Sequence, residues 1–102
     1  MEQKLVELQN LNDRVGAIRL ENSNNLRELI KKTILLIQTF ELDELLHAKK
    51  IERTIKVLEE LLTDYNFDIS RGSIAARNND LSAMKDIVQY EIEAIIRMPS
   101  LR

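Results

Sequence analysis

His47, the single histidine of this 102-residue chain, forms with Glu44 a pair whose spacing suits metal chemistry. Residues three positions apart share one face of a helix, and carboxylate-bridged di-iron bundles use this Glu-x-x-His spacing. Such a bundle needs a second copy of the motif and further glutamates that project into its core. We therefore interpret Glu44 and His47 as a solvated pair beside an apolar stripe and expect no metal and no cofactor. A metal-binding bundle is an alternative.

Nucleophilic and phosphate chemistry have little to build on in this sequence. None of the serines stands in a nucleophile-elbow pattern, and neither Gly16 nor Gly72 has the second glycine that a phosphate-binding loop requires. The adjacent carboxylates Glu59 and Glu60 point in different directions from a helix, which is typical of a solvated face. We expect no enzymatic activity.

The segment 73–97 has the outline of a helix-turn-helix DNA reader. An apolar start is followed by a polar turn at 78–80 and by a second amphipathic stretch, which offers Ser82, Lys85 and Gln89 to a DNA groove. Residues 67–102 hold five basic and five acidic side chains, however, so the region lacks the excess of positive charge that phosphate binding needs. A DNA-binding regulator is therefore the alternative function, and a capped helix start is the preferred interpretation.

The composition limits the class of protein. Fifteen basic against seventeen acidic residues give a net charge of −2, which argues against bulk attraction to nucleic acid. The chain has no cysteine, and two glycines and one proline are too few for a turn-rich β fold. The N-terminus lacks the basic and then apolar segments of a secretory signal. We expect a soluble, cytoplasmic, all-α protein with a single helical domain over residues 1–102.

The most apolar stretch, residues 26–40, organises the predicted fold. Its apolar residues recur at three- and four-residue steps, as along one face of a helix, and Leu35 and Leu36 widen this face until most of the circumference is apolar. A helix that is apolar nearly all round must be surrounded by other elements. We therefore predict that the side chains of residues 34–37 lie away from solvent.

Hydrophobic periodicity predicts helices over residues 2–20, 25–40, 43–66 and 80–97, with a short helical turn at 73–77. Asparagine and serine between 21 and 25 favour a break there, and Pro99 ends the last helix. The fold that follows is an antiparallel up-down-up-down four-helix bundle. The alternative is an elongated three-helix hairpin in which residues 2–40 form one long helix along which the chain dimerises.

Two details of these helices bear on their packing. Gly16 in the first helix either allows a close approach of a second helix or is merely tolerated. Leu46 and Leu61 widen the apolar stripe of the third helix. The stripe itself, which we expect to be buried, consists of Leu45, Ala48, Ile51, Ile55, Leu58, Leu62 and Tyr65.

The chain holds more large aliphatic side chains than four short helices cover with ease. Leu5, Val6 and Leu46 are expected to stay partly exposed, and an exposed apolar strip commonly marks an association surface. The competing interpretation is that every aliphatic side chain is used in the core.

We expect a non-enzymatic protein–protein interaction module, an inhibitor, adaptor, chaperone or immunity-type protein of bacteria or phages. Its expected partner is another protein or a second copy of the chain, and neither nucleic acid nor a membrane. The residues predicted to bind this partner are Leu5, Val6, Leu8, Leu11, Val15 and Leu46.

Overall fold

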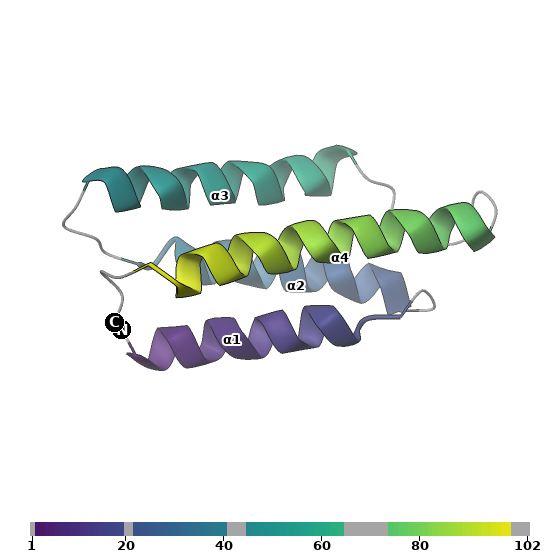
Figure 1. Cartoon of the computed structure of the whole chain (residues 1–102), viewed down its shortest axis with the longest axis horizontal. Coiled ribbons are helices and arrows are strands. Elements are labelled where there is room, and N and C mark those ends of the chain that lie inside the picture. The colour runs from purple at the N-terminus through teal and green to yellow at the C-terminus, as the bar shows by residue number, and fades with distance from the viewer. Residues whose placement is uncertain (1, 20–21, 41–44, 65–73, 99–102) are drawn as a thin grey trace.

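The computed structural model describes residues 2–19, 22–40, 45–64 and 74–98, and of residues 2, 23, 64 and 74–80 it describes the backbone alone. These ranges contain four α-helices and no strand: α1 (Glu2–Ala17), α2 (Ser23–Ile37), α3 (Leu45–Asp64) and α4 (Ile74–Ile96). The helices lie alongside one another in a molecule of 46 × 22 × 17 Å (Figure 1). The predicted all-α class is thus confirmed, and a four-helix bundle fits the arrangement.

The chain breaks between α1 and α2, so the alternative of one helix over residues 2–40 is wrong. α1 ends at Ala17, and α2 begins at Ser23, earlier than predicted. Asn22 stands at the N-cap position of α2 and makes no side-chain hydrogen bond to the helix. The low helix propensity of asparagine and serine therefore accounts for the break without the help of a side-chain cap.

α2 ends at Ile37, short of the predicted Phe40, because the chain tightens into a turn there. The amides of Thr39 and Phe40 donate to carbonyl oxygens three residues back, those of Leu36 and Ile37, at 3.0 and 3.2 Å. The hydroxyl of Thr39 also donates to Leu36 O, at 2.6 Å. These bonds satisfy carbonyl groups that the end of a helix leaves without helical partners.

α4 is continuous where the sequence predicts a break. It runs from Ile74 to Ile96 through residues 78–80, in place of a short turn at 73–77 and a separate helix from residue 80. Asparagine and aspartate cost less than about 1 kcal/mol each relative to alanine in a helix, and tertiary packing of the helix outweighs so small a penalty. The stop predicted at Pro99 lies outside the described residues.

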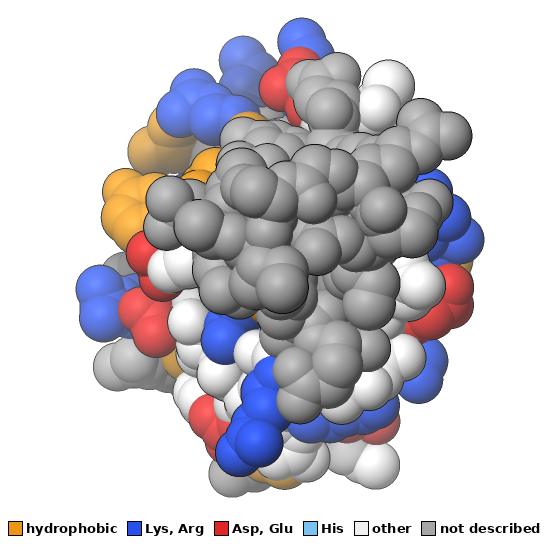
Figure 2. Space-filling view, turned by 90° about the vertical axis from the view of Figure 1, so that its right-hand side faces the viewer, with side chains coloured by type: hydrophobic (Ala, Val, Ile, Leu, Met, Phe, Trp, Pro, Cys, Tyr) orange, Lys and Arg blue, Asp and Glu red, His pale blue; other side chains and the backbone are white. Residues whose placement is uncertain are grey.

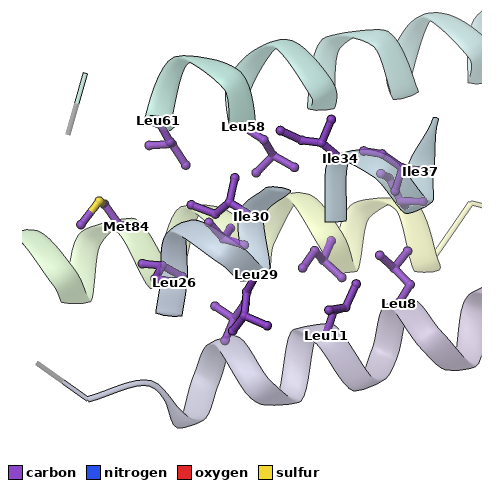
Figure 3. Close-up of a cluster of buried hydrophobic side chains, with 14 of the residues drawn as sticks. Leu8, Leu11, Leu26, Leu29, Ile30, Ile34, Ile37, Leu58, Leu61 and Met84 are labelled. Atoms are coloured by element: carbon purple, nitrogen blue, oxygen red, sulfur yellow. The ribbon is translucent and has the colours of Figure 1, made fainter. Parts of the chain in front are cut away.

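The hydrophobic core takes side chains from all four helices. Figure 3 shows Leu8 and Leu11 of α1 pointing toward the side chains of α2, and Leu58 of α3 pointing toward them from the opposite side. Within α2, Leu26 and Ile30 are fully buried. Among the side chains that the structure describes, the buried hydrophobic ones are Leu8, Leu11, Val15, Leu26, Leu29, Ile30, Ile34, Ile37, Phe40, Ile51, Leu58, Leu61, Leu81, Met84, Val88, Ile92, Ile95 and Met98.

The prediction that residues 34–37 all avoid solvent is wrong for Leu35. Ile37 is fully buried and Ile34 nearly so, but Leu35 is 65% exposed and Leu36 is partly exposed. Successive residues of a helix point about 100° apart, so α2 turns one side toward its neighbours and the other toward solvent. The run of four apolar residues therefore belongs to a wide stripe and not to a fully enclosed helix.

The buried stripe of α3 also differs from the predicted one. Ile51, Leu58 and Leu61 are buried as expected, but Leu45 is 69% exposed. Thr54, a polar residue that an apolar pattern passes over, is 2% exposed and completes the stripe. Of the other predicted positions, Tyr65 lies outside the described residues, and Ala48, Ile55 and Leu62 are partly buried.

α4 packs most closely on α1, and Gly16 lies at this contact. A Cβ atom placed on Gly16 would come within 2.8 Å of Gln89 Nε2. That nitrogen donates to Asn12 O at 3.3 Å, and Lys85 Nζ donates to Ile18 O at 2.8 Å. The missing side chain at Gly16 therefore leaves room for hydrogen bonds that join α4 to α1 and its end.

Replacing Gly16 with alanine tests this close approach. Alanine is favoured over glycine in a helix by up to about 1 kcal/mol, but its methyl group would displace the Gln89 amide from Asn12. We expect Gly16→Ala to leave the free energy of unfolding nearly unchanged in the native chain, and to raise it by roughly 1 kcal/mol when Gln89→Ala is also present. Urea unfolding followed by circular dichroism measures both. Equal gains in the two backgrounds would contradict the close contact.

Truncation to alanine at Ile37 and at Leu35 of α2 should change the free energy of unfolding by different amounts. Ile37→Ala removes a fully buried side chain and should lower the free energy of unfolding by roughly 2–5 kcal/mol. Leu35→Ala removes an exposed one and should change it by no more than about 0.5 kcal/mol. The same denaturation experiment compares them, and similar losses at both positions would show that Leu35 is part of the core after all.

Candidate partner-binding groove

The structure places only one residue of the Glu44–His47 pair. His47 lies in the first turn of α3 and is partly exposed, while Glu44 lies outside the described residues. The side chains that the structure describes include no group of three or more His, Asp or Glu residues placed to hold a metal ion.

The turn that DNA reading requires is absent, because α4 is continuous through residues 78–80. Of the three side chains expected to enter a DNA groove, Lys85 instead donates to Ile18 O at 2.8 Å and Gln89 to Asn12 O at 3.3 Å, both in partly buried positions. The described part of this segment is therefore one helix, Ile74–Ile96, that packs on α1, and not a helix-turn-helix.

The structure separates the six residues predicted to bind a partner into two groups. Leu8 and Val15 are fully buried and Leu11 is 8% exposed, so the chain's own helices already cover them and they offer no surface to another molecule. Val6 and Leu46 are exposed, at 56% and 75%. Leu5 is partly buried against the core. The partly exposed state expected for Leu5, Val6 and Leu46 is thus confirmed, although the three do not share one helix.

A groove of about 740 Å³ lies between the first half of α3 and the second half of α4. α4 packs far less on α3 than on α1, so these two helices do not close over the space between them. Leu46 of α3 and Tyr90 of α4 line the groove and are 75% and 71% exposed. Ala94 and Met98 also line it. In the end-on view of Figure 2, exposed hydrophobic side chains gather at the upper left, below a group of Lys and Arg side chains.

The lining residues follow helical intervals on each side. Leu46, Lys50 and Arg53 recur along α3 at four- and three-residue steps, as one face of a helix requires. Tyr90, Ala94 and Arg97 repeat the same steps along α4. Each helix therefore contributes to the groove a row that begins with an exposed apolar side chain and ends with an arginine.

One hydrogen bond connects the two helices at the groove. Thr54 Oγ1 donates to Glu91 Oε2 at 2.9 Å, and both residues line the groove. Because Thr54 is almost fully buried and its acceptor is charged, this bond is of the stronger, charge-assisted kind. It holds α3 and α4 together at this point, and the groove beside the bond stays open.

The charges of the groove are unbalanced in favour of cations. Its cationic lining residues are Lys49, Lys50, Arg53 and Arg97, and its acidic ones are Glu91 and Glu93. Arg97 and Glu93 pair with each other at 3.7 Å, and the same glutamate accepts from Asn12 Nδ2 at 3.4 Å. The three cations of α3 form no ion pair with any residue in the part of the chain that the structure describes.

Sequence reasoning named Leu46 but missed Tyr90. It considered an acidic partner or a membrane surface for the basic pair Lys49 and Lys50, and preferred to interpret the pair as part of a solvated helix face. The sequence offered only indirect evidence. Tyr90 is not among the residues of α4 that face the core, which are 81, 84, 88, 92 and 95, and Leu46 is likewise not among the buried residues of α3. Two off-stripe apolar residues on different helices form one site only once the helices are placed side by side. The sequence of either helix alone does not predict that the two lie side by side.

Comparison with known proteins gives no relative: no family model, no curated protein and no solved structure matches this chain. Among the helices that the structure describes, none is both long and apolar enough to cross a membrane. The groove is therefore assessed on its own geometry and charge.

The hydrogen bond between Thr54 and Glu91 has a matched test. Thr54→Val keeps the shape of the buried side chain and removes the hydroxyl, so we expect the free energy of unfolding to fall by about 1 kcal/mol. Thr63→Val on the same helix removes an exposed hydroxyl that bonds only to Glu59 O, and it should change stability by less than about 0.5 kcal/mol. Thermal or urea denaturation measures both variants. If Thr54→Val lowers the free energy of unfolding no more than Thr63→Val does, the hydrogen bond between α3 and α4 contributes little to stability.

Proposed function

We propose that this chain is a non-enzymatic protein–protein interaction module that binds its partner in the groove between α3 and α4. The supporting observation is the exposure of two large hydrophobic side chains, Leu46 and Tyr90, at 75% and 71%, on opposite sides of one groove. Exposed hydrophobic residues that stand singly are ordinary, but those gathered in a concave, polar-rimmed site are typical of a binding surface. Inhibitor, adaptor, chaperone and immunity-type roles all fit such a module.

The fold that we propose for this module is an antiparallel up-down-up-down four-helix bundle. Lys4, near the start of α1, donates to Thr39 O just after the end of α2, at 2.8 Å, which supports opposite directions for these two helices. The pairs Asn12–Glu93 and Ile18–Lys85 run in opposite order along α1 and α4, which supports the same relation there. Short links between successive helices favour this topology.

The proposed binding surface lies on α3 and α4 because the face of α1 is already in use. The a/d-type residues of α1, among them Leu8 and Val15, are covered by the chain's own core. Val6 remains as a single exposed aliphatic on α1, and Leu35 as one on α2. Neither lines the groove, so both serve as matched controls for it.

A helix is the form of partner that the groove accommodates best. The described part of the chain has no strand, and thus offers no sheet edge to which an extended peptide could add. A space between two neighbouring helices suits the ridge of side chains on a third helix. The proposed mode is therefore a helix in a groove.

Three glutamate substitutions locate the surface. We expect Leu46→Glu and Tyr90→Glu to abolish partner capture in pull-downs from the native host, because each places a charge where the partner buries an apolar side chain. Leu35→Glu, at an equally exposed position outside the groove, should leave capture intact. Circular dichroism checks that every variant is folded.

Two results would overturn the proposal. One is capture that survives Leu46→Glu and Tyr90→Glu but is lost with Val6→Glu, because the surface would then lie on α1. The other is a strictly monomeric chain that captures no protein, as judged by light scattering over a wide concentration range and by mass spectrometry of the pull-down.

A further inference from the structure

We infer that the occupant of the α3–α4 groove is an acidic amphipathic helix of another protein. This inference rests on the proposed function and adds the chemistry of the partner. The observations behind it are the charge of the groove, the bonds that engage its two carboxylates, and the helical spacing of its lining residues.

The charge of the groove is opposite in sign to that of the chain. Among the side chains that the structure describes, four cations and two carboxylates line it, whereas the whole chain has a net charge of −2. Positive charge on a net negative protein is thus concentrated around two exposed apolar side chains. Complementary charge across an interface favours the correct partner and speeds its association.

The two carboxylates of the groove are engaged by their own chain. Glu91 accepts the hydrogen bond of Thr54, and Glu93 contacts Asn12 and Arg97. These contacts leave Lys49, Lys50 and Arg53 without an ion pair to any described residue, and all three are exposed. Carboxylates of an occupant can therefore pair with these cations without displacing an ion pair of the described residues.

A second copy of the chain is disfavoured as the occupant. In a symmetric dimer whose two-fold axis passes through the groove, the grooves of the two protomers would face each other. Lys49, Lys50 and Arg53 of one protomer would then approach the same cations of the other. Like charges brought together at an interface oppose association.

A nucleic acid is disfavoured as well. The groove places apolar atoms of Leu46, Ala94 and Met98 where a polynucleotide would present phosphates. An amphipathic helix matches both parts of the lining, because it presents apolar side chains to the groove and carboxylates to its rim.

The spacing of the groove specifies the pattern of the partner helix. The row from Leu46 to Arg53 covers two turns of α3, or about 10 Å. The bond between Thr54 and Glu91 brings Arg53 to the part of α4 that holds Tyr90, so Leu46 and Tyr90 lie toward opposite ends of the groove. The partner helix should therefore have large apolar residues at positions i and i+7, with Asp or Glu at neighbouring positions.

Selection from a displayed library of random peptides of about 18 residues, enough for five helical turns, tests this inference on the full chain. We expect the enriched peptides to be acidic and to show apolar residues seven positions apart. Fluorescence anisotropy then measures their affinity. Lys49→Glu combined with Arg53→Glu should weaken it by roughly tenfold or more, and rising salt should weaken it further. Lys31→Glu combined with Lys32→Glu, the same change in net charge on α2, should alter it by no more than about twofold.

Other outcomes contradict the inference in separable ways. Enrichment of neutral or basic peptides that Leu46→Glu still abolishes would overturn the acidic partner and leave the groove as the binding site. Dissociation of a native dimer by Leu46→Glu would make a second copy the occupant. A fluorescent oligonucleotide that binds the native chain and not the Lys49→Glu, Arg53→Glu variant, with no peptide enriched, would make the occupant a nucleic acid. Peptides that bind every groove variant equally would overturn the proposed function itself.

Discussion

The close packing of α4 on α1 is the constraint on which the rest of this structure depends. Gly16 leaves no side chain between the two helices, and the Gln89 amide occupies the place where a Cβ would create a clash. Hydrogen bonds from Gln89 and Lys85 to carbonyl oxygens in and just after α1 fix the position of α4 along it. α4 is thereby held on one side of the molecule, and its contact with α3 is correspondingly sparse.

The open groove follows from this asymmetry. α3 is held chiefly by its buried stripe against α2, and its connection to α4 includes the bond between Thr54 and Glu91. Beyond this bond, α3 and α4 do not cover each other's side chains, and Leu46 and Tyr90 remain exposed. Charged residues on the same helical rows then surround the two apolar side chains with positive charge. A weakly closed pair of helices thus gives a small protein a surface of defined shape and charge.

Hydrophobic periodicity predicted the helical class and the approximate place of each helix, because core residues such as Leu8, Leu26 and Leu58 recur at helical spacing. It failed where local propensity and tertiary packing disagree. Asparagines at 78 and 79 suggested a turn, yet α4 continues through them, because their small cost in helix propensity is outweighed by the packing of the helix from Leu81 onward. It failed again at Leu35 and Leu45, since a list of apolar residues does not say which side of a helix meets a neighbour.

The candidate site was predictable only in part. Leu46 was expected to stay partly exposed because the chain holds more large aliphatic side chains than four short helices cover, and its exposure is confirmed. Its companion Tyr90 lies 44 positions away in the sequence, on another helix, so no local pattern connects the two. Leu8, Leu11 and Val15 were assigned to a partner because a row of apolar residues at helical spacing looks the same whether the helix that faces it belongs to the same chain or to a different one.

The openness of the groove can be measured directly with a soluble, neutral nitroxide that broadens the nuclear magnetic resonance signals of solvent-exposed methyl groups. The structure predicts strong broadening of the Leu46 methyl signals, comparable to that of the exposed Leu35, and little at the buried Ile51 and Leu58. Leu46 methyl groups as well protected as those of Ile51 would show that α3 and α4 close on each other, and the groove would not exist in solution.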